Sequence, residues 1–174
     1  MDSKAFYKLG YGLYIVSSRE GDKLNGQIAN TVFQVTSQPP TIAVSINKQN
    51  LTWAYIKASG TFGVSVLCQD TPLPFIGRFG FKSGRNDDKF EGINYKIGTI
   101  QTPLVLDNAT AIFEARVINS VDVITHTIFI GELVDSEVLN DKPCLTYEYY
   151  QQVKRGTTPK TAPSYVAEKK EETK

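Results

Sequence analysis

The feature that most constrains the fold is a repeated alternation of apolar and polar residues over short segments, a pattern typical of half-buried β-strands. It is clearest in residues 41–47, where Ile42, Val44 and Ile46 face one side and the residues between them face the other. Six segments share this β-rich character, namely residues 11–17, 26–37, 41–47, 62–66, 109–118 and 125–134. The last two are expected to form a hairpin or meander.

Helical signals are fewer and shorter than the strand signals. We expect short helices over residues 51–58, with Asn50 as the N-cap, and over residues 70–77 and 147–153. Because the strands do not alternate with long helices, the pattern argues against a doubly wound sheet and predicts a mainly β protein. A closed or nearly closed antiparallel barrel is the architecture that it favours.

The composition changes at residue 154 and divides the chain into a body and a tail. Residues 1–153 are expected to form one domain, and residues 154–174 a basic tail that is mostly extended or disordered. The tail holds six Lys and Arg against three Glu and has few apolar residues. Most of it therefore cannot bury enough apolar surface to pack.

Charge and composition exclude several functional classes. The formal net charge of +1 creates no global field that would attract nucleic acid. No apolar stretch approaches the roughly 20 residues of a membrane span, and the N-terminus shows no secretory signal. Cys68 and Cys144 are far apart and His126 is the only histidine, which excludes cysteine-based and multi-histidine metal motifs. We expect a cytoplasmic protein with reduced thiols and no nucleic-acid or membrane partner.

Two neighbouring stretches carry polar side chains suited to a ligand. Residues 27–40 place amides and hydroxyls among apolar strand residues, and in residues 45–52 a strand ends in a polar turn that opens a helix. A helix N-terminus offers free N–H groups and a partial positive charge to a phosphate. Lys48, Asn50 and Thr52 would add a charge and donors. The alternative is a capped helix with a solvated lysine, and the spacing alone leaves both open.

Two further features also have a structural and a functional interpretation. Residues 78–90 are rich in glycine, charge and phenylalanine, which fits either an ordinary surface loop or a functional one. His126 lies on a predicted strand, where a lone histidine is either a structural hydrogen-bonding residue or a catalytic one.

Taken in order, these segments resemble the flavin reductase-like family, in its flavoredoxin and NAD(P)H:FMN oxidoreductase branch. The residues that carry the resemblance are Asn30-Thr31, Ser37-Gln38-Pro39-Pro40, Ser45-Ile46-Asn47-Lys48-x-Asn50-x-Thr52, Phe81-x-Ser83-Gly84, Asp88-Lys89-Phe90, His126 to Glu132, and Tyr149 to Lys160. The resemblance implies a six-stranded antiparallel Greek-key split β-barrel with a few short helices. It also implies a homodimer that binds FMN near the subunit interface.

The resemblance further assigns roles to residues of this chain. It implies that His126 is catalytic, close to the flavin ring or a nicotinamide, although Thr125 stands where relatives commonly have an aspartate. It implies contacts with FMN from a strand along the ring, a phosphate-binding turn and a covering loop. These are Gln27, Ile28, Ala29, Asn30, Thr31 and Val32; then Ser45, Ile46, Asn47, Lys48, Asn50 and Thr52; and then Phe81, Ser83, Gly84 and Lys89.

The implied function is that of an NAD(P)H-dependent flavin (FMN) oxidoreductase. A hydride would pass from NADH or NADPH to FMN, and electrons would then pass to a flavin, a metal or a protein acceptor. Because the flavin supplies the redox reactivity, the protein needs no nucleophile or metal of its own. The alternative is a non-catalytic FMN electron carrier, like flavoredoxin, that a partner redox protein reduces. The sequence leaves open the acceptor, the choice of NADH or NADPH, and whether FMN exchanges as a substrate.

Overall fold

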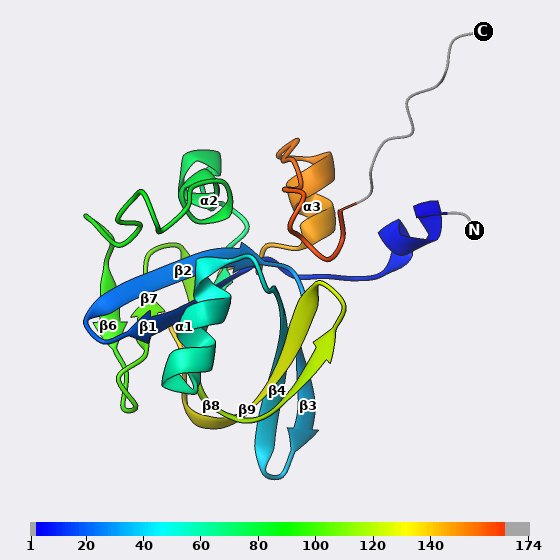
Figure 1. Cartoon of the computed structure of the whole chain (residues 1–174). Coiled ribbons are helices and arrows are strands. Elements are labelled where there is room, and N and C mark those ends of the chain that lie inside the picture. Colours follow the sequence, from blue (N-terminus) through cyan, green and yellow to red (C-terminus); the bar gives the residue numbers. More distant parts are fainter. Residues whose placement is uncertain (1–2, 166–174) are drawn as a thin grey trace, which may run out of the picture.

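A curled seven-stranded antiparallel sheet forms most of the protein in the computed structural model, which describes residues 3–165 (Figure 1). The strands lie in the order β2-β1-β5-β8-β9-β4-β3. Their bounds are β1 Tyr14–Glu20, β2 Lys23–Ala29, β3 Val32–Ser37, β4 Pro40–Asn47, β5 Thr61–Leu67, β8 Ala109–Val123 and β9 His126–Val138. No pairing among these strands joins β2 to β3, so the sheet remains open between its first and last strands. The mainly β class is confirmed.

The prediction of six strands is wrong, because one predicted strand is two. Residues 26–37 read as a continuous β-rich segment, but β2 ends at Ala29 and β3 begins at Val32. At the break, the carbonyl of Thr31 accepts a hydrogen bond from the amide of Ser45, 3.1 Å away. No glycine or proline marks this turn, which is why the alternation continues through it.

The pairing predicted for residues 109–118 and 125–134, a hairpin or meander, is confirmed as a hairpin. β8 pairs with β9 from Val123–His126 at the turn to Ala111–Val138 at the open end, and β9 pairs with β4 on its other side. A separate small sheet joins β6 Tyr95–Ile97 to β7 Pro103–Val105.

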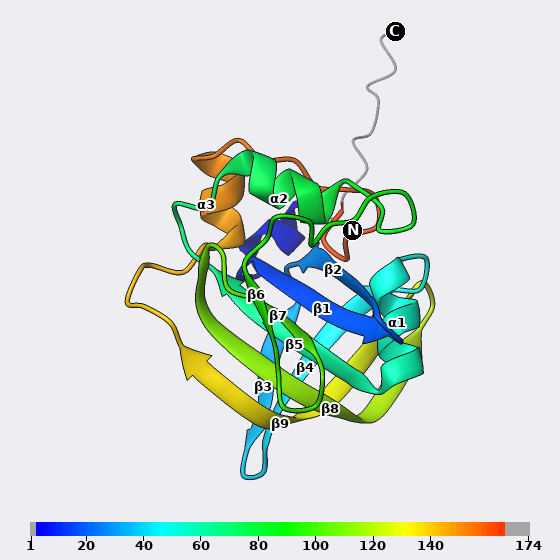
Figure 2. The same ribbon diagram turned by 90° about the vertical axis from the view of Figure 1, so that its left-hand side faces the viewer.

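The helices lie close to their predicted positions. They are α1 Leu51–Ser59, α2 Leu73–Gly80 and α3 Tyr147–Gln152, with a 3-10 turn, η1 Ser3–Lys8, at the start. Helix α1 ends where Gly60 adopts a left-handed φ of 69° and donates its N–H to Ile56 O, a conformation that favours glycine. Helices α2 and α3 lie beside each other at one end of the sheet (Figures 1 and 2).

Two main apolar clusters hold these layers together. One fills the inside of the curled sheet, where Phe62, Phe129 and Ile56 pack with neighbouring strand residues. The other lies between the sheet and helices α2 and α3, and includes Phe79 and Tyr150. Burial of apolar side chains at this level is the main stabilising contribution to such a fold. The second cluster also holds α2 and α3 over one end of β2.

The described part of the tail, through Tyr165, has no helix or strand, but it folds back along α2 and α3 (Figure 2). Residues 166–174 of the predicted tail lie outside the described residues, and the domain boundary at residue 153 stays a prediction. Within the described chain, none of the helices has the length and apolar character that crossing a membrane would require.

Candidate functional site

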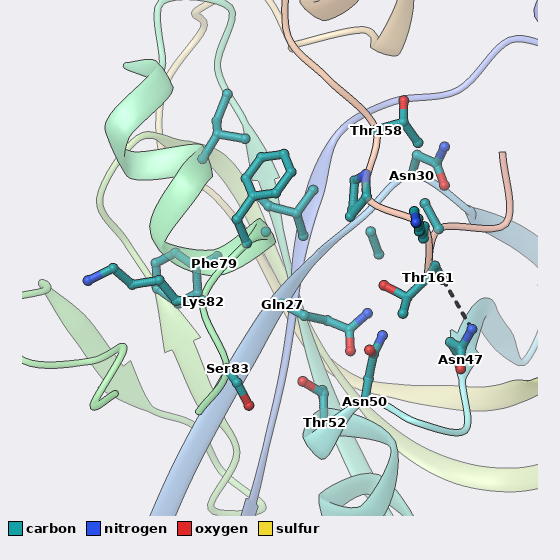
Figure 3. A pocket seen from close by; sticks show the side chains of 18 of the residues that line it. Gln27, Asn30, Asn47, Asn50, Thr52, Phe79, Lys82, Ser83, Thr158 and Thr161 are labelled. Carbon is teal, nitrogen blue, oxygen red and sulfur yellow. Dashed lines mark hydrogen bonds between the residues drawn. The ribbon is translucent and has the colours of Figure 1, made fainter. Parts of the chain in front are cut away.

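A pocket of about 310 Å³ opens between β2, the start of α1, helices α2 and α3, and the tail. This volume is at the lower end of the range for small-molecule sites. Figure 3 shows its polar side: Gln27 from β2, with Asn50 and Thr52 from the start of α1, point toward one another at the cavity floor.

The polar side offers amide groups with spare hydrogen-bonding capacity. Asn25 donates from Nδ2 to Thr52 Oγ1 at 2.8 Å, which anchors β2 to α1. The carbonyl oxygens Asn25 Oδ1 and Gln27 Oε1 are buried and have no partner among residues 3–165. Buried polar atoms are normally satisfied, so these two acceptors indicate a ligand that donates hydrogen bonds here.

The opposite side of the pocket is apolar and aromatic. Ile76 and Phe79 come from α2, and Tyr147 and Tyr150 come from α3. The two tyrosine rings stack with centroids 6.0 Å apart. One wall that offers amides and another that offers rings suits a ligand with one polar edge and one apolar edge.

The start of α1 forms the part of the pocket suited to an anion. Asn50 occupies the predicted N-cap position, but its side chain makes no capping hydrogen bond. The positive end of the α1 helix dipole, at the first turn of the helix, therefore faces the pocket. Arg85, from the loop after α2, reaches this turn and donates from Nη2 to Gln49 O at 3.3 Å. Lys82, in the same loop, directs its ammonium away from the cavity (Figure 3).

Lys89 is buried in the pocket wall, with 5% of its surface exposed. Its ammonium donates to the carbonyls of Gly26, at 2.9 Å, and Phe79, at 3.2 Å. Burial lowers the pKa of Lys89 to about 8, while the charge of Asp87 acts weakly in the other direction. Lys89 thus connects β2 to α2 and fixes the width of the pocket.

Lys48, in contrast, lies outside the pocket lining. Its ammonium is 3.3 Å from Asp122 Oδ2 at the β8–β9 turn, in a half-exposed ion pair. The predicted contact of Lys48 with a phosphate is not supported by this placement, because its ammonium pairs with Asp122 of β8 and Lys48 does not line the pocket. Arg85, distant in sequence, is the cation at that turn.

His126 also lies beside the pocket and not in its lining. It pairs in register with Asn47, which does line the pocket, and its Nδ1 is 2.9 Å from Thr125 Oγ1. His126 Nε2 is buried without a hydrogen-bond partner in the described chain. Burial lowers the pKa of His126, and the nearby backbone of Thr161 opposes this shift.

The structure brings together twelve of the sixteen residues predicted to bind a cofactor, namely Gln27, Ile28, Ala29, Asn30, Ser45, Asn47, Asn50, Thr52, Phe81, Ser83, Gly84 and Lys89. Besides Lys48, three do not line the pocket. Ile46 and Val32 pack into the core inside the sheet. Thr31 bonds instead to Asn30, with 3.2 Å between its Oγ1 and Asn30 Oδ1.

Sequence reasoning missed the contribution of the tail. Residues 157–163 line the pocket, and hydrogen bonds tie this stretch to both walls. Asn30 donates to Ser164 Oγ at 2.5 Å, and Asn47 donates to Thr161 O at 3.3 Å, the contact drawn in Figure 3. From α3, Tyr150 donates to Thr157 O at 2.9 Å. The composition of the tail gave no sign of these contacts, although residues 149–160 formed part of the family resemblance.

A profile of the flavin reductase like domain matches residues 6–158. The chain belongs to this family. It is therefore an oxidoreductase of the flavin reductase type, and the resemblance found in the sequence is confirmed.

Two curated proteins are closely similar to this flavin reductase in sequence. A ferric-chelate reductase (NAD(P)H) of Archaeoglobus fulgidus is 53% identical over 169 residues, which cover 97% of this chain and 100% of the relative. A high molecular weight rubredoxin of Moorella thermoacetica is 57% identical over 165 residues, which cover 95% of this chain and 72% of the relative.

Solved structures share the fold of this flavin reductase. The NADH:FAD oxidoreductase SgcE6 of Streptomyces globisporus superposes with a TM-score of 0.74 at 22% identity, over 82% of this chain and 84% of the other. A flavoredoxin from Methanosarcina acetivorans gives a TM-score of 0.69 at 23% identity, over 74% and 69% of the two chains.

The chemistry of the residues that line the pocket fits a flavin. The polar edge of a flavin ring presents an N–H donor between two carbonyl acceptors, and the free acceptors of Asn25 and Gln27 and the amide groups beside them complement such an edge. The aromatic side from α2 and α3 suits the apolar end of the ring. Among the described residues there is no cluster of three or more His, Cys, Asp or Glu side chains arranged to hold a metal ion.

Proposed function

We propose that this flavin reductase binds FMN in the pocket and uses NADH or NADPH to reduce it, with onward electron transfer to a flavin, a metal chelate or a protein. The observation that carries the proposal is the meeting, in one pocket, of unpartnered amide oxygens, an uncapped helix N-terminus and an aromatic wall. The bound flavin would supply the hydride and electron chemistry, and the protein would supply binding, orientation and exclusion of water.

Different residues of the chain would bind the phosphate, contact the ring or the ribityl chain, and set the spacing of the pocket walls. The turn at Asn50 and Thr52, with Arg85, would hold the phosphate, because a helix N-terminus and a guanidinium both favour an anion. Asn25 and Gln27 would accept hydrogen bonds from the ring or the ribityl chain. Lys89 would keep β2 and α2 at the spacing that the ring requires, through its two carbonyl contacts.

The two close relatives suggest the acceptor. The Archaeoglobus relative, which this chain covers from end to end, is named a ferric-chelate reductase, so a chelated ferric ion is the first acceptor to test. The second candidate function is electron transfer with a small redox protein, which the name of the rubredoxin relative favours. In that case a partner protein, and not NAD(P)H, would reduce the bound flavin.

We also propose that the protein is a homodimer whose interface adjoins the pocket. The register of β3, β4, β9 and β8 places Phe33, Val121, Val123, Ile128 and Ile130 on the outer face of the sheet. We call these five residues the outer apolar face. Phe33, Val121 and Val123 are each about half exposed, at 51%, 48% and 46%. A contiguous apolar surface of this kind indicates a protein contact.

This outer apolar face continues directly into the pocket. Ser45 pairs with Ile128 and Asn47 pairs with His126, and both Ser45 and Asn47 line the pocket. A second copy of the chain seated on the face would cover the rim of the site. The curled sheet also supports the Greek-key split-barrel description, and the two free cysteines, Cys68 and Cys144, agree with a reducing cytoplasmic location.

The experiment combines flavin loading with anaerobic reduction. Purified protein is loaded with FMN, freed of excess flavin, and mixed with NADH or NADPH without oxygen. Rapid loss of the flavin absorbance, followed by its return on addition of ferric citrate, is the expected result. Protein that takes up FMN but is reduced only by a reduced rubredoxin would favour the carrier, and protein that binds no flavin would contradict both functions.

A further inference from the structure

Cys68 and Cys144 lie directly opposite each other, although they are distant in sequence. Cys68 follows β5, Cys144 lies between β9 and α3, and the two form an isolated antiparallel bridge. Leu145 N–H donates to Leu67 O at 2.7 Å, and Gln69 N–H donates to Pro143 O at 2.8 Å. Because these two bonds flank the cysteines, the cysteines form a non-hydrogen-bonded pair, the closer of the two antiparallel pair types.

This pair type satisfies the backbone requirement of a disulfide. Its Cα atoms are typically about 4.5 Å apart with the side chains on one side, and disulfides need Cα separations of roughly 4.4 to 6.8 Å. Both thiols are free in the structure. Each sulfur contacts a threonine hydroxyl instead, Cys68 Sγ that of Thr71 at 3.5 Å and Cys144 Sγ that of Thr110 at 3.6 Å. Rotation about the side-chain Cα–Cβ bonds is the main movement that a disulfide needs.

The surrounding contacts hold the two segments in this register. Leu145 is fully buried, and its carbonyl accepts a hydrogen bond from Leu13 N–H at 2.9 Å. Two residues beyond the cysteines, Lys142 Nζ lies 3.0 Å from Asp70 Oδ2. The bridge is therefore fixed by contacts on both sides of the cysteine pair.

We propose that Cys68 and Cys144 are a thiol pair that a peroxide closes reversibly into an intramolecular disulfide, which ties together the segments that lead into α2 and α3. The proposal goes beyond the flavin chemistry and does not depend on it. Exposed Cys144 meets the oxidant first, since Cys68 is buried, with 2% of its surface exposed.

The chemistry balances in two steps. The Cys144 thiolate attacks hydrogen peroxide, which forms an S–O bond, breaks the O–O bond and yields a sulfenic acid and hydroxide. The Cys68 sulfur then attacks the Cys144 sulfur, which forms the S–S bond and releases water with the proton of Cys68. Burial, with Asp70 beside it, raises the pKa of the Cys68 thiol. Cys68 therefore stays protonated and poorly reactive toward peroxide until Cys144 is oxidised.

A disulfide between Cys68 and Cys144 would affect the pocket, because both residues precede helices that line it. Cys144 precedes α3, whose Tyr147 and Tyr150 form one part of the aromatic wall, and Cys68 precedes α2, which contributes Phe79. The disulfide would join the two segments just before these helices and restrict their relative movement over the pocket.

The test treats purified full-length protein with hydrogen peroxide and then alkylates the remaining thiols. We expect wild-type protein to lose both alkylatable thiols, to show a linked Cys68–Cys144 peptide by mass spectrometry, and to recover both thiols with dithiothreitol. Amide hydrogen exchange in α3 should slow several-fold on oxidation. In the Cys68→Ser variant, Cys144 should stop at the sulfenic acid, which dimedone traps, and in Cys144→Ser the remaining thiol should stay reduced.

Other outcomes overturn the proposal. They are oxidation of Cys144 alone while Cys68 remains alkylatable, a disulfide between two chains, or no reaction at either thiol. A linked peptide with unchanged amide exchange in α3 would overturn the proposed restriction of the helices. Each readout is independent of flavin reduction, so failure here is distinguishable from failure of the proposed function.

Discussion

Arg85 donates a hydrogen bond to the carbonyl oxygen of Gln49, 3.3 Å away, and so joins the loop after α2 to the turn before α1. The two residues are 36 positions apart, and the contact places a guanidinium beside an uncapped helix N-terminus. We therefore propose for Arg85 the phosphate contact that sequence proximity suggests for Lys48.

The first prediction is that Arg85→Ala weakens binding of FMN but not of riboflavin, which has no phosphate. Because Arg85 is exposed, we take the lower end of the range for a charged hydrogen bond, about 1.5 kcal/mol or roughly tenfold in Kd. Lys48→Ala is the matched control and should leave both affinities within about twofold, since Lys48 pairs with Asp122. Fluorescence titrations of both ligands measure the effect, and equal losses for FMN and riboflavin would place the phosphate elsewhere.

The different placements of Lys48 and Arg85 show which features local sequence patterns can predict. Regular alternation predicts β4 to within one residue, and residues of the polar turn before α1 line the pocket. Local patterns determine these features. Which cation faces the turn depends on how the loop after α2 folds back, and alternation carries no information about that.

The tail is a second feature that local sequence patterns do not predict. Asn30 and Ser164 are 134 positions apart, yet their side chains are hydrogen-bonded. A segment with few apolar residues, like residues 154–165, is normally expected to stay unpacked. Here polar contacts to Asn47 and Tyr150 hold it over the pocket, and such contacts have no periodicity that a sequence would reveal.

The second prediction concerns this tail. A chain that ends after Gly156 loses the tail residues that line the pocket, residues 157–163, so FMN should dissociate at least several-fold faster from it. A chain that ends after Tyr165 keeps them and serves as the control. Stopped-flow dilution of the FMN-loaded proteins measures the rates. Equal rates in the two truncated chains would mean that residues 157–165 do not retain the cofactor.

The third prediction follows from the lowered pKa of Lys89. Between its folded pKa of about 8 and the unfolded value of 10.5, the unfolded chain binds the proton that folded Lys89 has released. The free energy of unfolding should therefore rise with pH in this window, by at most about 1.4 kcal/mol per unit. Below pH 8 the burial penalty of the charged ammonium is fully present.

Urea denaturation at several pH values between 7.5 and 10.5 measures this slope. Lys89→Met should flatten it relative to wild type, because methionine has no titrating group, even if the variant is less stable overall. Lys82→Met, an exposed lysine in the same loop, should keep the wild-type slope. A Lys89→Met profile parallel to that of the wild type would show that Lys89 does not titrate in this range.

The fourth prediction is that the outer apolar face mediates dimer formation. Val121→Glu places a charge on that face and should convert a dimer into a monomer, because an unpaired charge is costly to bury in an interface. Leu73→Glu, an exposed apolar position on α2, should leave the dimer intact. Light scattering after gel filtration gives the masses, and a wild-type monomer that holds FMN tightly would contradict the proposal.

The last prediction separates a functional from a structural role for His126. The residue continues the outer apolar face, pairs with pocket-lining Asn47, and has a buried Nε2 without a partner in the described chain. If that nitrogen serves the reaction, His126→Ala should slow reduction of bound FMN by NADH at least several-fold while FMN affinity changes little. A purely structural residue would give a lower Tm and an unchanged rate constant per flavin-loaded molecule.

The pH dependence of stability supplies the second readout for His126. Burial lowers its pKa below the usual 6.5, so the unfolded chain binds more protons just below that pH, and wild-type stability should fall as the pH drops through it. His126→Ala should lose this part of the decline whichever role the residue has. Single-turnover reduction, normalised to bound FMN, therefore decides between the two roles. A rate constant equal to that of the wild type would remove His126 from the mechanism.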